Sequence, residues 1–374
     1  MNYQYDAIVV GGGVIGGSIA YSLAKRGGRV LLLEKDRLAS KSSGAAAGML
    51  GAQVEFDGVG PLFQLAKESR SMFTKLANEI KETSGMDIEL MNKGMLKVAL
   101  NDQEQQDYKR VITAQRQSGE QAEWLTGEEV RRKEPAISQA VLGAMLVEKD
   151  GQVEAPQLTL GFLKSAAVMG VEIKEHMEVY NFHFTCGKVT GVVTNEGDFL
   201  SENVILAGGA WSKKLLSETG LQLDTYPVKG ECFSVVSHCP LVSSTIFSHG
   251  CYLVPKKGGR IVVGATVKPR TFNPKVSIEG ISFLMEQAKK LVPSIIEAEW
   301  ERAWAGIRPQ TLDGYPYLGE HPTYKGLFIA TGHFRNGILL SPITGEIIAD
   351  LVEGKQTAMN LEAFRVDRFA KQFV

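Results

Sequence analysis

The sequence predicts an α/β fold in which two domains are interleaved along the chain. Three observations support this prediction. Residues 5–34 read as a strand, a glycine-rich loop, a helix and a second strand. Apolar strands that run into glycine loops recur in the middle of the chain, at 203–211, and near its end, at 326–337. Between these signals, residues 226–270 alternate in the manner of successive strands separated by turns.

The elements can be placed in order from their periodicity and their end signals. The first strand covers 5–10, the glycine loop 11–17, the helix 14–26 and the second strand 29–34. Residues 86–147 mix strands with a polar helix. We expect the remaining helices at 61–83, 102–118, 156–169, 277–292 and 337–352, and further strands at 177–184, 188–194, 203–207 and 326–330.

Composition indicates a soluble globular protein. The chain has 374 residues, too many for one ordinary core, with 44% hydrophobic and 22% charged residues. Its 41 basic and 42 acidic residues nearly cancel, so neither nucleic acid nor an anionic membrane is an expected partner. No apolar stretch approaches the roughly 18 residues of a spanning helix. The opening residues lack the pattern of a signal peptide, and we expect a cytoplasmic protein without stable membrane association.

Four cysteines, Cys186, Cys232, Cys239 and Cys251, form no C-x-x-C pair and fit no zinc template. Free thiols in a reducing compartment are the expected state, and no metal site is predicted.

The first glycine loop carries the strongest motif. Gly11-Gly12-Gly13-Val14-Ile15-Gly16 matches G-x-G-x-x-G, lies between a strand and a helix, and is followed by Glu34 at the end of the next strand. Gly11 permits the tight turn, Gly13 the approach of a pyrophosphate, and Gly16 the packing of helix on strand. The helix N-terminus favours phosphate. Glu34 is suited to accept hydrogen bonds from ribose hydroxyls, so the motif predicts a dinucleotide site of the Rossmann type.

The motif alone does not separate FAD from NAD. An NAD dehydrogenase usually continues with further βα repeats, whereas this sequence continues into the small-residue segment 40–52. Ser42 and Ser43 are candidates for hydrogen bonds to ribose or pyrophosphate, and the backbone of 45–48 is suited to lie against a flat ring. A flexible surface loop is the alternative, but its apolar content argues against it.

Several segments together resemble the D-amino-acid oxidase/sarcosine oxidase superfamily, and within it the bacterial glycine oxidases of the thiamine pathway. They are the N-terminal fingerprint, Ser-Ser-Gly-Ala-Ala-Ala-Gly-Met-Leu (42–50), Arg-Pro-Gln-Thr-Leu-Asp-Gly-Tyr-Pro-Tyr-Leu-Gly (308–319) and Gly-His-Phe-Arg-Asn-Gly-Ile-Leu-Leu (332–340). The resemblance runs over nearly the whole chain. It implies a Rossmann-like FAD-binding domain interleaved with an α+β substrate domain on an antiparallel sheet, and a homotetramer.

Applied to this chain, the predicted FAD-binding domain comprises 1–85, 148–220 and 309–374, and the substrate domain 86–147 and 221–308. By the same resemblance, the cofactor contacts fall on Val14, Ile15, Glu34, Lys35, Ser42, Ser43, Ala47, Gly48, Met49, Val179, His333, Phe334, Arg335, Asn336, Gly337, Ile338 and Leu339. Val267 and Gly250 depart from the family pattern, which often has Met and His there, and both departures bear on substrate preference.

A small amino acid must be held by its carboxylate so that its Cα hydrogen faces the flavin. Arginine is suited to this because its planar fork donates two charge-assisted hydrogen bonds. Arg308, at an expected strand end before Pro309, is the leading candidate; the alternative is a surface arginine paired with Asp313. For Arg335 three roles stay open: sharing the carboxylate, facing the flavin, or serving the structure alone. As a lone strand residue Tyr252 would more often be core, but the resemblance assigns it to the clamp, with Met49 and Ala52 at the pocket mouth.

No histidine–carboxylate pair with convincing spacing appears, so no acid–base residue is predicted. This suits hydride transfer from Cα to flavin N5, which requires orientation rather than a strong base. His333 is expected to be structural or to contact the flavin through its backbone. The helix that begins near Gly337 would stabilise the reduced flavin with its N-terminus. Because no cysteine follows Cys251, FAD is expected to be held non-covalently.

Three functions remain open from the sequence. The first is a glycine oxidase that also takes sarcosine and small D-amino acids, reduces O2 to H2O2 and supplies the glycine imine for the thiazole of thiamine. The second is a D-amino-acid or sarcosine dehydrogenase that uses another electron acceptor. The third is a non-catalytic FAD-bearing subunit, against which Arg308 and Tyr252 together argue.

Overall fold

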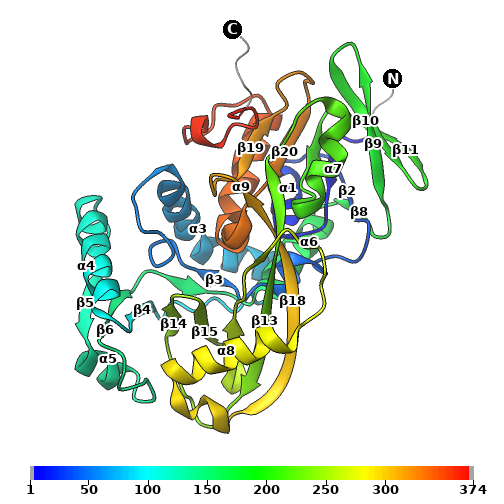
Figure 1. Ribbon diagram of the computed structural model, residues 1–374. Helices are drawn as coiled ribbons and strands as arrows, with labels where there is room; N and C mark the ends of the chain where they lie inside the picture. Colours follow the sequence, from blue (N-terminus) through cyan, green and yellow to red (C-terminus); the bar gives the residue numbers. More distant parts are fainter. Residues whose placement is uncertain (1–3, 370–374) are drawn as a thin grey trace.

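The structure is a computed structural model that describes residues 4–369. Its first layer is a six-stranded sheet assembled from distant parts of the chain (Figure 1). Four inner strands and the edge strand β8 run parallel, and only β19 is antiparallel to its neighbour. The strand order is β19 (Tyr317–Glu320), β20 (Leu327–Thr331), β12 (Val204–Leu206), β1 (Ala7–Val10), β2 (Val30–Leu33) and β8 (Glu172–Lys174).

Both faces of this sheet are covered, which explains why its strands read as unbroken apolar runs. One face packs against α1 (Val14–Lys25), α3 (Pro61–Ser84), α6 (Ala155–Val168) and α9 (Gly337–Val352). Helices α1 and α9 approach closely at Gly345, where a Cβ would lie 2.3 Å from the Ser18 hydroxyl. The other face packs against the sheet of β9 (Val179–Thr185), β10 (Lys188–Thr194) and β11 (Gly197–Leu200).

The second layer is a nine-stranded sheet, antiparallel except where β14 runs parallel to β4. Its two longest strands pair along nearly their whole length (Figure 1). They are β13 (Thr225–Val236) and β18 (Glu299–Thr311). The other strands are β4 (Met95–Ala99), β5 (Glu123–Thr126), β6 (Gly143–Val147), β14 (Thr245–Ser248), β15 (Cys251–Pro255), β16 (Arg260–Gly264) and β17 (Lys268–Pro269).

Three helices accompany the second sheet. Helix α8 (Ile278–Leu291) buries Leu284 and Ala288 in the core that this sheet shares, and α5 (Gly127–Lys133) buries Val130 there. Helix α4 (Asp102–Gln117) packs against the neighbouring core of β4 and β6. A two-stranded pair, β3 (Met49–Leu50) with β7 (Gly151–Gln152), lies where segments of both layers meet.

The predicted α/β class, with an antiparallel second sheet, is confirmed. The expected helices and strands lie within a few residues of their predicted ends. The 13-residue β18 was not predicted as a strand, although Arg308 was placed at a strand end; it lies in β18, three positions before its last residue. The segment boundaries proposed for the two domains stay a prediction, as does the absence of an export signal, which falls partly on residues outside 4–369.

Across residues 4–369, no helix combines the length and apolar character needed to cross a bilayer.

Candidate functional site

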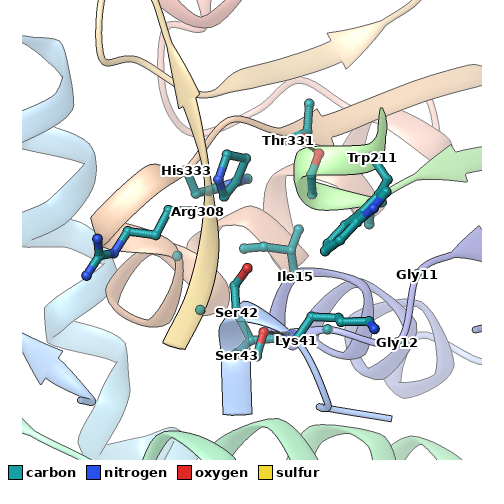
Figure 2. A pocket seen from close by; sticks show the side chains of 18 of the residues that line it. Gly11, Gly12, Ile15, Lys41, Ser42, Ser43, Trp211, Arg308, Thr331 and His333 are labelled. Atoms are coloured by element: carbon teal, nitrogen blue, oxygen red, sulfur yellow. Dashed lines mark hydrogen bonds between the residues drawn. The ribbon is translucent and has the colours of Figure 1, made fainter. Parts of the chain in front are cut away.

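An elongated cavity of about 480 Å³ lies between the two layers. Its walls come from the first βα turn, the segment 33–49, the start of β9, residues 207–218, strands β13, β15 and β18, and the turn before α9. In the close view, Arg308 and His333 lie toward one end and Trp211 with Lys41 toward the other (Figure 2). Distant segments of the chain therefore meet around one site.

The first glycine turn lines one end of the cavity. Gly11 has a φ of +118°, and a Cβ there would lie 2.6 Å from the carbonyl oxygen of Ala207. A Cβ on Gly16 would lie 1.9 Å from the Gly11 carbonyl oxygen, so any larger residue would push helix α1 away. Gly16 thus packs helix on turn, as expected, and does not line the cavity.

Glu34 is buried at the end of β2 and lines the cavity. Its two carboxylate oxygens accept hydrogen bonds from the backbone N–H groups of Gly12, at 2.7 Å, and Asp36, at 2.8 Å. These bonds fix the carboxylate in one orientation. An ionised carboxylate offers about four acceptor sites, so acceptor capacity remains for hydroxyl groups in the cavity.

The small-residue segment after β2 is tied to the second layer and is not a flexible surface loop. The Ser42 hydroxyl donates to the carbonyl of Ile307, and the indole N–H of Trp304 donates to the carbonyl of Ala45 at 2.9 Å. The Ser43 hydroxyl accepts from the N–H of Val14 at 2.9 Å, at the start of α1. Both serines line the cavity, so they lie where phosphate or ribose contacts were predicted.

Residues 47–49 form one wall near the centre of the cavity. Gly48 has a φ of +85°, and a Cβ there would lie 1.9 Å from the Val153 carbonyl oxygen. Only glycine fits, because the backbone is pressed between the cavity and β7. Ala47 and Met49 pack with Cys232 and Tyr252 in a small apolar cluster, which makes this wall apolar.

Arg308 reaches the cavity from β18. Its guanidinium lies flat against Gly230 of β13, where a Cβ would sit 2.2 Å from two of its nitrogen atoms. One nitrogen donates to the carbonyl of Thr266 at 3.3 Å, and no carboxylate pairs with it among the described residues. Asp313 instead pairs with Arg368, at 2.8 Å, so the alternative of a surface Arg308–Asp313 pair is wrong.

Tyr252 is buried on β15 and lines the same end of the cavity. Its hydroxyl lies 3.5 Å from the Cys232 sulfur atom. Burial raises the pKa of the Tyr252 hydroxyl well above its usual value, and the positive charges of Arg308 and Arg335 partly oppose this rise. The hydroxyl is therefore a neutral hydrogen-bond donor that faces both arginines.

Arg335 lines the cavity from the turn before α9, and its guanidinium is bound to Glu55 at 3.2 Å. It also lies over the ring of Phe247, 5.6 Å from its centroid. Of the two arginines at this end, one is therefore paired with a carboxylate and one is not.

His333 is buried at the base of this turn, and its Nε2 lies 3.1 Å from the Thr344 hydroxyl. Burial lowers the pKa of His333 to about 3, so the ring is neutral at physiological pH. Helix α9 begins at Gly337 without a side-chain cap, and its preceding residue, Asn336, has a buried Oδ1 with no hydrogen-bond partner. The N-terminus of α9, which follows a 3-10 turn over Phe334–Asn336, therefore lies beside the cavity without a side-chain cap.

The structure brings most predicted site residues to one cavity. Asn336 and Leu339 do not line it, and Leu339 is buried in the core beneath α9. The prediction that Ala52 lies at the pocket mouth is wrong, because its side chain is fully buried in the same core. Sequence reasoning did not single out Lys41, Glu55, Trp211, Gly230 and Cys232, which do line it. Trp211 ends the segment 203–211, whose strand-to-glycine pattern repeats that of 326–337, and this signal could have pointed to it; Lys35 and Lys41 both lie over its ring.

These features fit a bound FAD. The fixed Glu34 carboxylate suits a ribose, the glycine turn at the start of α1 suits a pyrophosphate, and the apolar wall of 47–49 suits a ring system. The start of α9, which has no side-chain cap and lines the cavity at Gly337 and Ile338, is suited to face a polar ring edge. Among the described residues, no three His, Cys, Asp or Glu side chains gather as metal ligands.

Comparison with known proteins agrees with this geometry. Residues 6–351 match the DAO family model, described as FAD dependent oxidoreductase. The chain is 47% identical over 371 residues to a glycine oxidase from Geobacillus kaustophilus, covering 98% of each protein. A crystal structure of glycine oxidase from the same organism superposes with a TM-score of 0.96 over 98% of this chain and 99% of that one. A bifunctional ThiO/ThiG protein from Synechocystis is 32% identical over 99% of this chain and 55% of its own length.

Proposed function

The chain belongs to the DAO family of FAD-dependent oxidoreductases, and from this premise we propose that it is a glycine oxidase. It oxidises glycine, and also sarcosine and small D-amino acids, to glyoxylate or the matching keto acid. Ammonia or an amine is released, and O2 is reduced to H2O2. The full-length similarity to the Geobacillus glycine oxidase supports this substrate class.

One observation carries the proposal at the level of the site. Arg308, with no carboxylate partner among the described residues, and the neutral Tyr252 hydroxyl face the same end of the cavity. An arginine with free donors beside a hydroxyl is suited to hold one carboxylate in a fixed orientation. The apolar side chains of Ala47 and Met49 lie in the cluster that contains Tyr252 and line the same cavity.

When bound, FAD would accept a hydride from the substrate Cα and pass the electrons on to O2. The protein's own contribution is orientation and electrostatics. Arg308 and Tyr252 hold the carboxylate, while Met49 and Ala47 exclude water from the reacting carbon. The N-terminal end of α9, with the positive end of its dipole, stabilises negative charge that gathers beside it. His333 is poorly suited to act as a base, because burial lowers its pKa to about 3 and its Nε2 is bonded to Thr344.

We infer the cellular setting from other features. A homotetramer is supported by exposed apolar side chains on and near α8 and β18: Phe272, Ile278, Phe283, Met285 and Trp300. Cytoplasmic location is supported by four free cysteines. A role in supplying the glycine imine for the thiazole of thiamine is supported by the similarity to the ThiO/ThiG protein.

The experiment is anaerobic titration of the purified holoprotein with glycine, sarcosine and D-alanine, followed by admission of air. Bleaching of the flavin band and then H2O2 formation are expected. The second candidate, a dehydrogenase with another acceptor, is favoured if the band bleaches but air does not restore it. A flavin band that none of the three amines bleaches would contradict both.

A further inference from the structure

The acidic side chain of Glu55 lines the cavity beside the two arginines of the substrate end. The Glu55 side chain is only 6% exposed and its carboxylate is bound to the Nε of Arg335 at 3.2 Å, whereas the Arg335 side chain is 35% exposed. The carboxylate is thus the buried member of the pair. Arg335 contacts Glu55 through its Nε, lies over the ring of Phe247 and lines the cavity.

Glu55 is held in place by a network that lies outside the cavity. Asp150, fully buried, accepts hydrogen bonds from the N–H groups of Gln53, at 3.0 Å, and Val54, at 2.9 Å. Arg70 pairs with Asp150 at 2.5 Å and also bonds the Gln53 side chain at 2.8 Å. The backbone immediately before Glu55 is therefore fixed, and the carboxylate cannot leave Arg335 by a movement of the loop alone.

The packing around Glu55 is equally tight. A Cβ on Gly51 would lie 3.0 Å from the Glu55 Cγ and 2.8 Å from a methyl group of Val54. Farther along the segment, Asp57 pairs with Lys97 at 2.8 Å. The position of the Glu55 carboxylate is thus built into the fold rather than chosen by a mobile side chain.

The charges at this end of the cavity follow from these contacts. Two arginines and one carboxylate leave one net positive charge, because Tyr252, Cys232 and His333 are all neutral at physiological pH. One positive charge matches an amino acid with one carboxylate and a neutral amine. Without the Glu55 charge, the same space would hold two unpaired guanidinium groups and would suit a ligand with two anionic groups.

We propose that Glu55 is a specificity-determining residue that occupies Arg335 and thereby restricts this end of the cavity to substrates with a single carboxylate. The proposal rests on the proposed function only for the class of substrate. The effect of Glu55 itself is on how many carboxylate groups this end of the cavity can bind. Small dicarboxylic amines and acids are the ligands that Glu55 excludes.

The test measures binding rather than turnover. Acetate and malonate, which carry one and two carboxylates and no oxidisable amine, are titrated into the FAD-loaded protein by calorimetry. In Glu55→Gln, which keeps the shape of the side chain and removes its charge, malonate should bind at least about tenfold more tightly relative to acetate. That factor corresponds to one gained charge-assisted hydrogen bond. In the double variant Glu55→Gln/Arg335→Gln the gain should vanish, since the receiving guanidinium is gone.

Asp57→Asn provides a matched control, because it removes a carboxylate from the same segment at a position that does not line the cavity. It should leave the malonate-to-acetate ratio as in the parent protein. Equal tightening of both ligands in Glu55→Gln, or no change in either, would overturn the proposal. So would a malonate gain that persists in the double variant. If Glu55→Gln does not fold, Glu55→Ala is used in its place. A change of less than twofold in the malonate-to-acetate affinity ratio of Glu55→Ala would then refute the proposal.

The two proposals fail separately. If the parent protein does not turn over glycine, the oxidase function is contradicted, but the malonate-to-acetate affinity ratio still tests the role of Glu55. An unchanged ratio in Glu55→Gln would contradict the role of Glu55 and leave glycine oxidation standing.

Discussion

Gly230 is the residue on which the position of Arg308 depends most directly. A Cβ at Gly230 would lie 2.2 Å from both terminal nitrogens of the Arg308 guanidinium. An ordinary contact needs 3.4 Å or more, so Gly230→Ala must move the guanidinium by about 1 Å or turn it away. The obstacle is the far end of a flexible side chain, so we expect the strand to accept the alanine and the arginine to give way.

The expected cost falls on substrate binding. Losing a well-placed charge-assisted pair costs about 1.5–3 kcal/mol, and each 1.4 kcal/mol corresponds to about tenfold in affinity. We therefore expect the glycine KM of Gly230→Ala to rise by about 10- to 100-fold. Stability should be unchanged or slightly higher, because alanine is favoured over glycine inside a strand by about 0.5–1 kcal/mol.

The assay is steady-state peroxide release against glycine concentration, with the melting temperature measured on the same samples. Arg308→Ala should raise the KM to a similar extent. The double variant Gly230→Ala/Arg308→Ala should be no worse than Arg308→Ala alone, because both changes remove one interaction. A KM that stays within twofold of the parent protein, or additive losses in the double variant, would refute the reasoning that Gly230 acts through Arg308.

Three buried polar groups give further predictions. Glu34→Ala should weaken FAD retention during dialysis, because the fixed hydrogen-bond acceptor is lost. Saturating FAD should restore the rate of glycine oxidation, and a rate that stays low would contradict a ribose-binding role for Glu34. Asp150→Ala should lower the free energy of unfolding in urea by about 3–5 kcal/mol, because Arg70 loses a buried partner, and a loss below about 1 kcal/mol would argue against this. Because the folded pKa of His333 is lowered to about 3, the unfolded chain binds the extra proton below about pH 6.5. Stability should therefore fall as the pH drops from about 6.5 toward 3, by up to about 1.4 kcal/mol per pH unit, and His333→Gln should show a shallower slope in denaturation series at about pH 6.5 and 5.

Local patterns made the cofactor end of the site predictable from the sequence. The glycine turn, helix α1 and Glu34 lie within one continuous segment, so their spacing alone determines how they meet. Arg308 could be predicted because it stands next to Pro309, within the segment that resembles the family, and because arginine is the side chain best suited to hold a carboxylate. Its predicted place near a strand end agrees with its position in β18.

The residues that were missed share a different property: they come together only through pairing between distant strands and segments. Gly230 meets Arg308 because β13 and β18 pair in a register that sets Val228 opposite Arg308. Glu55 reaches Arg335 through a fold of the chain held by Asp150, and no local pattern signals that contact. Strand β18 itself was missed because its first four residues, Glu299 to Arg302, are exposed and three of them are charged, so this end lacks the apolar run of a buried strand.

The strand order of the six-stranded sheet governs when the site can exist during synthesis. Strand β20 lies between β19 and β12, and α9 packs beside α1, yet both emerge from the ribosome near the end of translation. Until then the growing chain carries the open edge of β12 and the uncovered apolar face of α1. The cofactor site is therefore complete only after nearly the whole chain has been synthesised.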